Sequence, residues 1–321
     1  MEYRLVAQTT HCAMGTVMAH KAFGVYAKEA LAAVRREVSG IEERLSCFLP
    51  ESEISRVNRS AGKKSEKVTR ETHDVLSTAA EFSRSFPGCF DVTIGPLVSL
   101  WKVGKESSVQ PDDSSIRQAL PLVNYRDLIL NPGKRTAGLR NAGQSVDLGA
   151  IGKGVAGDKI VEVFKRFGIS SAFSNLGGNV VTVGAKPDGS PWQIGIQHPR
   201  QQNGLIGSVA VVNQTVVTSG DHQRCFMDSR GKRHHHILDP TTGYPADSGL
   251  ISVSIVTDRS VAADPLSTIV FVAGMEKGLT ILRSFPQTEA ILVDSDLYVY
   301  VTQGLRSRFQ AAKGIAVTIL D

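Results

Sequence analysis

One stretch near the middle of the chain, Asp147-Leu-Gly-Ala-Ile-Gly-Lys-Gly154, constrains the fold most. It carries three glycines within six positions, and a helical pattern follows from Val155 to Phe167. Glycine permits positive φ and lets backbone N–H groups approach a ligand closely. The N-terminus of the following helix, together with the charge of Lys153, suits a phosphate group. A tight turn between a strand and a helix explains the same spacing, so the stretch alone leaves both interpretations open.

Composition indicates an ordinary globular protein with enough apolar residues for a sizeable core. The chain has 321 residues, of which 41% are hydrophobic and 21% charged. Its net charge of +5 comes from scattered basic residues, with 6% aromatics, which favours a small anionic ligand at least as well as a nucleic acid. The four cysteines form no CxxC pair, so neither a disulfide framework nor a cysteine zinc site is expected.

The sequence shows no membrane-spanning segment, because no apolar run reaches the roughly 18–20 residues that a bilayer requires. The N-terminus, Met1 to Val6, has no hydrophobic signal-peptide region. We therefore expect a cytoplasmic protein. If a leader has been removed upstream, a periplasmic or membrane-anchored protein is expected instead.

Helical and strand patterns occur in groups along the chain. Apolar periodicity predicts two early strands within residues 3–26, and loops include residues 104–114. Helices are predicted over 27–45, 69–86, 115–122, 155–167, 265–273 and 277–285, and a further short helix is predicted to end near Asn58. A strand-like start is predicted at 89, and strands over 128–130, 136–139, 171–183, 192–197, 207–212, 215–218, 234–238, 250–257, 290–293 and 297–301. This grouping predicts an α+β fold with largely antiparallel sheets, not a doubly wound parallel sheet.

A run of three histidines, His234 to His236, precedes the turn Asp239-Pro-Thr-Thr-Gly243. On a strand, His234 and His236 would share a face that excludes His235. A zinc cage made from the run alone is therefore not expected. A histidine leading into such a turn is either a general base or a core residue, and the pattern alone favours the core residue.

A third group is Asp264-Pro265-Leu-Ser-Thr268. Proline at the first helical position with Asp264 before it predicts a capped helix start. Asp264 and Thr268 are four residues apart, so their oxygens can lie on one side of that helix. Such oxygens suit Mg²⁺, and capping and metal binding can coexist because a carboxylate has two oxygens.

Eight short motifs then occur in order, and together they resemble the ApbE family of flavin transferases. Each motif alone is weak, but eight in the same order are specific. The matching segments are Met14–Thr16, Leu45–Asn58, Phe90–Trp101, Asp147–Gly154, Asn175–Asn179, Thr218–Asp221, His236–Gly243 and Ala263–Thr268.

The resemblance implies one ApbE-like domain over residues 1–321, an α+β, T-fold-like arrangement of largely antiparallel sheets with packed helices. It implies an enzyme that moves FMN from FAD to a threonine or serine hydroxyl of an acceptor flavoprotein. Mg²⁺ would be required, a phosphoester bond would form and AMP would be released. The implied partners are FAD and the acceptor, without nucleic acid.

The resemblance also assigns roles to individual residues. His236 matches the catalytic histidine, which would take the proton from the acceptor hydroxyl. The Mg²⁺ ligands would be the Ala150 carbonyl and the side chains of Asp264 and Thr268. The FAD contacts would be Met14, Phe48, Phe90, Asp91, Val92, Asp147, Lys153, Gly177, Gly178 and Ile237.

Some positions depart from the family pattern. Phe48 stands where tyrosine is usual, which keeps a stacking ring but loses a hydroxyl. Pro265 replaces a more usual small residue. His222 and Cys225 stand where aromatic residues are more common, a difference that bears on acceptor recognition more than on the chemistry.

Other functions remain open from the sequence. An FAD pyrophosphatase that releases FMN and AMP would use the same site, with water replacing the hydroxyl. A non-catalytic FAD-binding protein is a second alternative, although His236 beside an intact Asp264 and Thr268 pair argues against it. Nucleic-acid binding has only the mild basic charge behind it.

Overall fold

The computed structural model describes residues 5–104, 108–228 and 230–320. Residues 3–4 of the predicted first strand and 105–107 of the predicted loop lie outside the described residues. Contacts divide the chain into a first unit (1–41, 151–219 and 249–321) and a second unit (42–150 and 220–248). The single domain over 1–321 stays a prediction.

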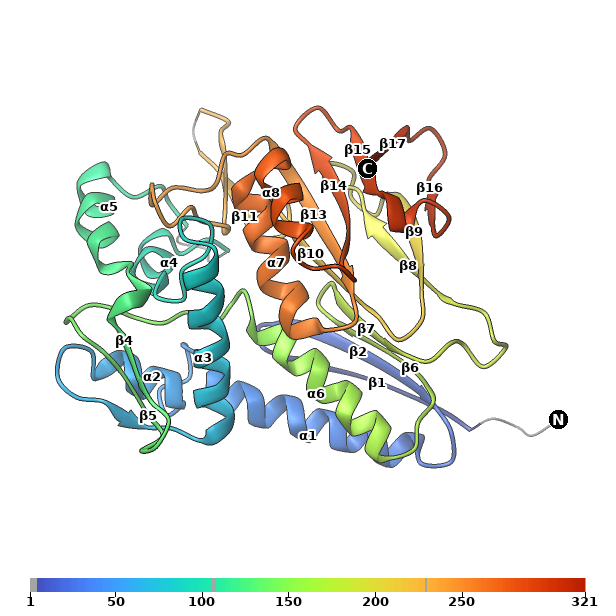
Figure 1. Ribbon diagram of the computed structural model, residues 1–321, viewed down its shortest axis with the longest axis horizontal. Coiled ribbons are helices and arrows are strands. Elements are labelled where there is room, and N and C mark those ends of the chain that lie inside the picture. The colour runs from blue at the N-terminus through green and yellow to red at the C-terminus, as the bar shows by residue number, and fades with distance from the viewer. Residues whose placement is uncertain (1–4, 105–107, 229, 321) are drawn as a thin grey trace. The chain divides into compact units, whose positions relative to one another are not determined.

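A nine-stranded sheet forms the centre of the first unit (Figure 1). Its neighbours pair antiparallel from β1 through β10 and from β13 through β15, and β15 pairs with β17 in parallel. In spatial order the strands are β1 (Val6–Ala13), β2 (Thr16–Phe23), β6 (Ser171–Leu176), β7 (Asn179–Val183), β10 (Thr215–Gly220), β13 (Leu250–Thr257), β14 (Glu289–Asp294), β15 (Val299–Thr302) and β17 (Val317–Leu320).

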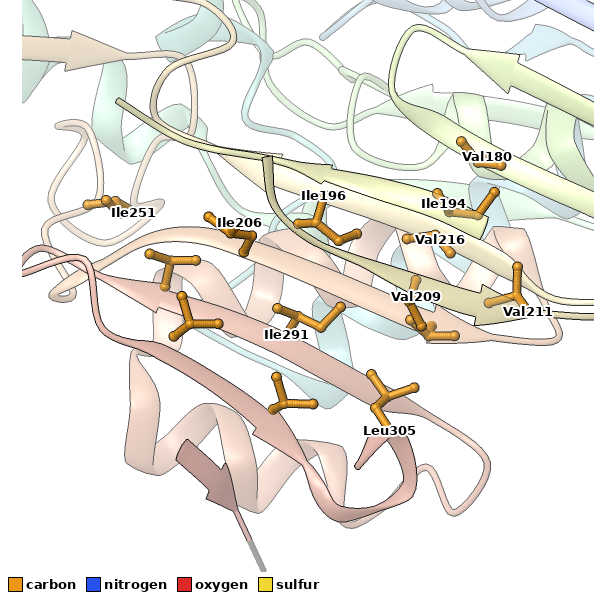
Figure 2. Close-up of a cluster of buried hydrophobic side chains, with 14 residues drawn as sticks. Val180, Ile194, Ile196, Ile206, Val209, Val211, Val216, Ile251, Ile291 and Leu305 are labelled. Atoms are coloured by element: carbon orange, nitrogen blue, oxygen red, sulfur yellow. The ribbon is translucent and has the colours of Figure 1, made fainter. Parts of the chain in front are cut away.

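One face of this sheet packs against a smaller sheet of three strands, β16 (Phe309–Ala311), β9 (Leu205–Val211) and β8 (Trp192–Gln197). Aliphatic side chains fill the space between the sheets, as Figure 2 shows. Val180 of β7 enters this cluster, whereas a Cβ on Gly157 would meet Val181. Successive strand residues point to opposite faces, so the helix that carries Gly157 covers the other face of the sheet.

The helices of the first unit are α6 (Gly152–Arg166), α7 (Ser260–Ala273), α8 (Met275–Leu282) and most of α1 (Ala27–Leu45). Helix α6 packs on β6 and β7, and α7 packs on β13. The predicted α+β class with largely antiparallel sheets is confirmed by this arrangement. Among the described residues, no helix has the length and apolarity needed to cross a bilayer.

The second unit combines short helices with small sheets. Its centre is Trp101, whose Nε1–H donates to the Gly243 carbonyl at 2.8 Å and whose ring packs with Leu97, Ile116 and Leu238. Its elements are α2 (Glu53–Arg59), β3 (Glu66–Lys67), α3 (Arg70–Ser85), α4 (Gly95–Trp101), α5 (Asp113–Ala119), η1 (Leu120–Leu122), η2 (Tyr125–Asp127), β4 (Leu128–Asn131), β5 (Thr136–Leu139), β11 (Cys225–Met227) and β12 (Arg233–His235).

Helix α7 begins earlier than predicted, at Ser260, so the prediction that Asp264 caps it and that Pro265 opens it is wrong. The carboxylate of Asp158, on α6, accepts the Ser260 N–H at 2.7 Å and caps the helix from outside. Pro265 lies inside the helix and lacks the N–H that would reach the carbonyl of Val261, four residues earlier.

Other boundaries also differ. The segment predicted to start as a strand at 89 forms turns and then α4. Helix α6 starts three residues before the predicted 155, and β12 ends at His235 instead of 238. Strands β3, β11 and β16 were not predicted, because each has only two or three residues. Such short segments are below the length at which alternation is recognisable. Strand β17, of four residues, was not predicted either.

Helices α6 and α7 approach each other at two glycines. A Cβ on Gly154 would lie 2.9 Å from the Asp264 Cβ and still closer to the Ser260 carbonyl oxygen. A Cβ on Gly157 would lie 2.8 Å from the Ser260 Cβ. Both positions therefore require glycine, because the Ser260 carbonyl at Gly154, and the side chains of Ser260 and Val181 at Gly157, occupy the space that a side chain would need.

Replacing Gly154 by alanine should lower the free energy of unfolding by about 1–3 kcal/mol, because overpacking outweighs the better helix propensity of alanine. Urea unfolding measures this difference. Gly133→Ala is the matched control, since that glycine has no positive φ and its nearest neighbour would be 3.6 Å from the new Cβ. Equal stability of the two variants would contradict the close approach of the helices.

Buried His20 should make the first unit sensitive to acid. Its Nδ1 lies 2.9 Å from Ser174 Oγ, its ring stacks on His11, and it is 2% exposed. Burial first, and then the nearby His11 and Arg35, lower the pKa of His20 from 6.5 to about 4. Between these values the unfolded chain binds a proton that the folded protein does not, so folding is disfavoured as pH falls.

The free energy of unfolding should therefore fall as the pH drops from 6.5 towards 4, by about 3 kcal/mol for this group. Urea titrations at several pH values measure the slope. His20→Gln keeps a polar side chain but removes the titration, so its slope should be flatter. A variant with the same slope as the natural protein would show that His20 is not the responsible group.

Candidate functional site

Two tight turns of the first unit carry predicted FAD contacts. Met14 and Gly15 join β1 to β2 with φ of +51° and +69°, the signs required by a type I′ hairpin turn. Gly177 and Gly178 join β6 to β7, also with positive φ. A Cβ on Gly177 would overlap the side chain of Thr16, so glycine is required where the two hairpins meet.

Met14 also reaches the start of α6. Its Cε would lie 3.2 Å from a Cβ placed on Gly152, the first residue of that helix. The first turn of a helix has N–H groups without intrahelical acceptors, which makes it suitable for an anion. The structure thus brings Met14 to the glycine-rich end of α6, as expected if both contact one ligand.

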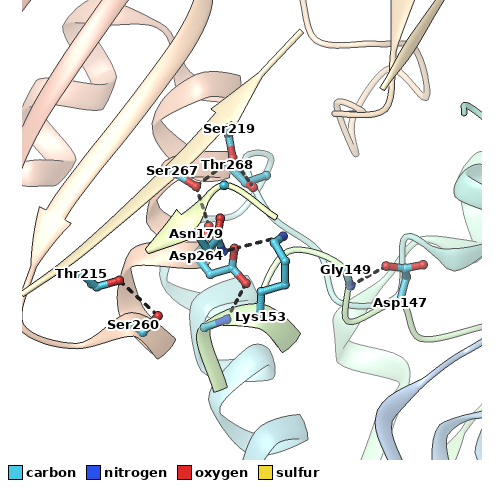
Figure 3. Close-up of polar contacts among 12 residues, drawn as sticks. Asp147, Gly149, Lys153, Asn179, Thr215, Ser219, Ser260, Asp264, Ser267 and Thr268 are labelled. Atoms are coloured by element: carbon cyan, nitrogen blue, oxygen red, sulfur yellow. Dashed lines mark hydrogen bonds and ion pairs between the residues drawn. The ribbon is translucent and has the colours of Figure 1, made fainter. Parts of the chain in front are cut away.

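The carboxylate of Asp264 is buried, with 4% exposure, at the centre of the polar contacts in Figure 3. Its Oδ2 accepts the Gly154 N–H at 2.9 Å, and its Oδ1 accepts the Asn179 Nδ2–H at 2.9 Å. Lys153 Nζ lies 3.7 Å from Oδ1. Two donors and one cation therefore compensate the burial of this charge.

Thr268 lies one helical turn after Asp264 on α7. Its Oγ1 is 3.3 Å from Ser219 Oγ, which is 2.8 Å from Ser267 Oγ. The Ser267 hydroxyl in turn donates to the Asp264 carbonyl at 2.8 Å. The Ser219 hydroxyl of β10 and the Ser267 hydroxyl of α7 thus link the Thr268 side chain to the Asp264 backbone, as Figure 3 shows.

The donor set fits Mg²⁺. Carboxylate and hydroxyl oxygens are the ligands it prefers, and each Asp264 oxygen keeps a lone pair beyond its hydrogen bond. Within the residues that the structure describes, no group of three or more His, Cys, Asp or Glu side chains is arranged to hold a metal ion. A single-carboxylate site suits Mg²⁺ if phosphate oxygens and water complete the shell. Ala150 belongs to the second unit, and its role as a carbonyl ligand stays a prediction.

In the second unit, His236 directly follows β12 and is half-buried. Its N–H donates to the Arg224 carbonyl at 3.1 Å, and its ring Nδ1 lies 3.2 Å from the same oxygen. A carbonyl can only accept, so this bond places the ring proton on Nδ1. The basic lone pair is then on Nε2, as a general base requires.

The other two histidines of the run have different partners. His234 is buried, its Nε2 lies 3.2 Å from Asp228 Oδ2, and its ring stacks on Phe226. His235 has its Nε2 3.0 Å from the Ala246 carbonyl oxygen, and burial lowers the pKa of this imidazole. Each ring is therefore held by a separate acceptor.

The predicted FAD contacts of the second unit differ in exposure. Phe48 is 70% exposed. The side chains of Phe90, Val92 and Ile237 are buried, so a contact from any of them would come from the backbone or from the shape that they give the surface.

The two acidic residues of this set order their own loops. Asp91 accepts the Thr93 N–H at 2.8 Å on Oδ1 and the Tyr125 N–H at 3.0 Å on Oδ2, and burial raises the pKa of its carboxyl. Asp147 accepts the Gly149 N–H at 2.7 Å and the Cys47 thiol at 3.5 Å. Asp147 thereby fixes the residue beside Phe48.

Sequence reasoning missed the side chains of Asn179 and Ser219, which hold Asp264 and Thr268. Both belong to motifs noted in the sequence, Asn175–Asn179 and Thr218–Asp221. Their place in these motifs was the signal that could have identified them.

The predicted site residues are divided between the two units. The first unit contains Met14, Lys153, Gly177, Gly178, Asp264 and Thr268. The second unit contains Phe48, Phe90, Asp91, Val92, Asp147, Ala150, His236 and Ile237.

The curated proteins that are similar to this chain include two with the same name. A Klebsiella pneumoniae protein named FAD:protein FMN transferase is 35% identical over 283 residues, covering 88% of this chain and 87% of its own length. A Treponema pallidum protein of the same name is 35% identical, with 82% of this chain and 76% of its own covered.

Among solved structures, the ApbE protein of Thermotoga maritima superposes with a TM-score of 0.87 at 27% identity, covering 95% of this chain and 99% of its own. The apo flavinyl transferase ApbE of Pseudomonas stutzeri gives 0.83 at 26% identity, with 97% and 100% covered. The family model for ApbE matches residues 14–292. The chain therefore belongs to the ApbE family.

Proposed function

We propose that this protein transfers FMN from FAD to a threonine or serine hydroxyl of an acceptor flavoprotein, with Mg²⁺ bound. The names of its curated relatives support this reaction class. The observation that carries it is the Arg224 carbonyl, which holds the His236 ring with its lone pair on Nε2. A base in that tautomer is what activation of a neutral hydroxyl needs.

In the proposed reaction, His236 Nε2 takes the proton from the acceptor hydroxyl. The hydroxyl oxygen forms a bond to the FMN phosphorus, and the anhydride bond between the two phosphates of FAD breaks. FMN becomes a phosphoester on the acceptor, and AMP leaves with the electron pair of the broken bond. No oxidant or reductant is required.

In this proposal, residues of the first unit stabilise the negative charge on the pyrophosphate of FAD. Asp264 and Thr268 would hold the metal with the Ala150 carbonyl, and Lys153 adds a positive charge beside them. Bound Mg²⁺ would neutralise charge on the pyrophosphate as the bond breaks. The donors of Gly154 and Asn179 keep the Asp264 carboxylate in one orientation before the substrate binds.

The flavin and its phosphates would be bound by the remaining predicted residues. The exposed Phe48 ring offers a stacking surface, and Met14 offers an apolar contact beside the first turn of α6. Gly177 and Gly178 have no side chains, so a phosphate can approach their N–H groups closely. Phe90, Asp91, Val92, Asp147 and Ile237 would shape this surface.

Co-expression with a candidate acceptor tests the function. Mass spectrometry should find the mass of FMN as a phosphoester on a threonine or serine of the acceptor. Incubation with FAD and Mg²⁺ but no acceptor should release little AMP. Rapid AMP release without an acceptor would instead support the FAD pyrophosphatase alternative.

His236→Ala should reduce the rate of FMN transfer by about 10²–10⁴-fold, because a positioned general base contributes an acceleration of that size. FAD binding, measured by flavin fluorescence, should remain close to that of the natural protein. His235→Ala serves as a neighbouring control for damage to the local fold. An unchanged transfer rate in His236→Ala would disprove the assigned base.

Thr268→Val should raise the Mg²⁺ concentration for half-maximal activity by about tenfold, since valine has the same shape but lacks the hydroxyl ligand. Thr268→Ser keeps the oxygen and should behave like the natural protein. Activity at increasing Mg²⁺ gives both values. If valine leaves the Mg²⁺ dependence unchanged, Thr268 does not bind the metal.

A further inference from the structure

The strands β11 and β12 form a two-stranded sheet of their own within the described residues. The Asp228 N–H donates to Lys232 O at 2.9 Å, and the His236 N–H donates to Arg224 O at 3.1 Å. In an antiparallel pair, hydrogen-bonded positions alternate with positions whose N–H and C=O groups point outward. The hydrogen bonds therefore fall at even-numbered residues of β11 and its flanks.

Cys225 and Met227 occupy the alternate positions of β11, opposite His235 and Arg233. Their backbone N–H and C=O groups turn away from β12. Within the part of the chain that the structure describes, no backbone hydrogen bond joins either residue to another segment. Met227 is also 55% exposed. The outer edge of β11 is thus an open template for another strand.

Ring stacking and the hydrogen bonds of Asp228 order strand β11 and the turn that follows it. The rings of Phe226 and His234 stack at 5.1 Å, and the His234 ring lies 5.5 Å from that of Trp101. Asp228 Oδ1 accepts the Arg230 N–H and the Lys232 N–H, each at 2.9 Å, and its Oδ2 lies 3.2 Å from His234 Nε2. A pre-ordered edge loses little entropy when a partner strand binds.

The edge leads to the proposed base. Arg224 immediately precedes β11, and its carbonyl holds the His236 ring. A chain that pairs with Cys225 and Met227 lies on the edge of β11 opposite β12 and would continue past Arg224. Because β11 begins at Cys225, a side chain from its next residues could pass the end of the strand towards the His236 ring. An acceptor segment must present a hydroxyl there, and an extended backbone is a common way to do so.

Charge favours the same occupant. Three basic residues are exposed on or beside this hairpin, namely Arg224, Arg230 and Lys232. The hairpin also contains the acidic residue Asp228, which lies 3.5 Å from Arg230 and binds His234. The excess of positive charge complements an acidic partner.

We propose that the acceptor's target segment, extended and carrying acidic side chains, binds as an added β-strand on the outer edge of β11. This inference rests on the proposed transferase function. Affinity would come from main-chain hydrogen bonds to Cys225 and Met227, and the basic residues of the hairpin would favour acidic neighbours of the target hydroxyl.

Met227→Pro tests the edge, because proline removes the outward N–H without breaking the ladder to β12. We expect the KM for the acceptor to rise roughly fivefold to tenfold, as for the loss of one hydrogen bond. Met227→Ala keeps the N–H and should stay within about twofold, a smaller effect than loss of a backbone hydrogen bond. FAD binding and the tryptophan fluorescence, to which Trp101 contributes, should not change in either variant, which shows that the hairpin remains folded. An unchanged KM in Met227→Pro would overturn the proposal.

A second measurement does not depend on folding of a variant. The probe is a synthetic nine-residue peptide centred on the flavinylated residue of the acceptor, N-methylated at one amide at a time. Strand addition predicts that two amides two residues apart are sensitive and that the amide between them is not. Uniform tolerance, or sensitivity at adjacent amides, would overturn strand addition while leaving FMN transfer intact. Absence of transfer by the unmodified protein would overturn the proposed function and this inference with it.

Discussion

The buried carboxylate of Asp264 is the interaction on which the first unit depends. Its two oxygens bind a backbone N–H of α6 and a side-chain amide of β7, with the Lys153 ammonium nearby. Without these partners, burying a charge would cost several kcal/mol. Three motifs far apart in the sequence are therefore one structural unit, because none could keep this geometry alone.

Helices α6 and α7 also cap each other. Asp158 of α6 binds the first N–H of α7, and Asp264 of α7 binds the Gly154 N–H in the first turn of α6. Gly154 and Gly157 let the backbones approach closely enough for both bonds. This changes the meaning of the glycine-rich stretch, since at least one of its glycines serves helix packing while Lys153 carries the charge.

The sequence predicted elements where the signal is local. The bounds of α1 match the prediction, and α3 differs by only one residue at each end, because both have a long apolar period and α3 begins at the Thr69 cap. The start of α7 was missed because its cap lies 102 residues earlier on another helix. Strand β17 was missed because it pairs in parallel with β15, which leaves no hairpin turn in the sequence. The resemblance supplied the candidate site, but the partner of Asp264 on β7 required the fold.

The histidine run shows the same limit at the level of chemistry. Spacing indicates which way a ring points, but not which atom its neighbours bind. His235 places Nε2 against a carbonyl and Nδ1 near the Ile237 N–H, so both nitrogens are used within the fold. His236 instead binds its carbonyl through Nδ1, which leaves the basic lone pair on Nε2. Two adjacent residues of one type thus face backbone carbonyls through opposite ring nitrogens, Nε2 in His235 and Nδ1 in His236.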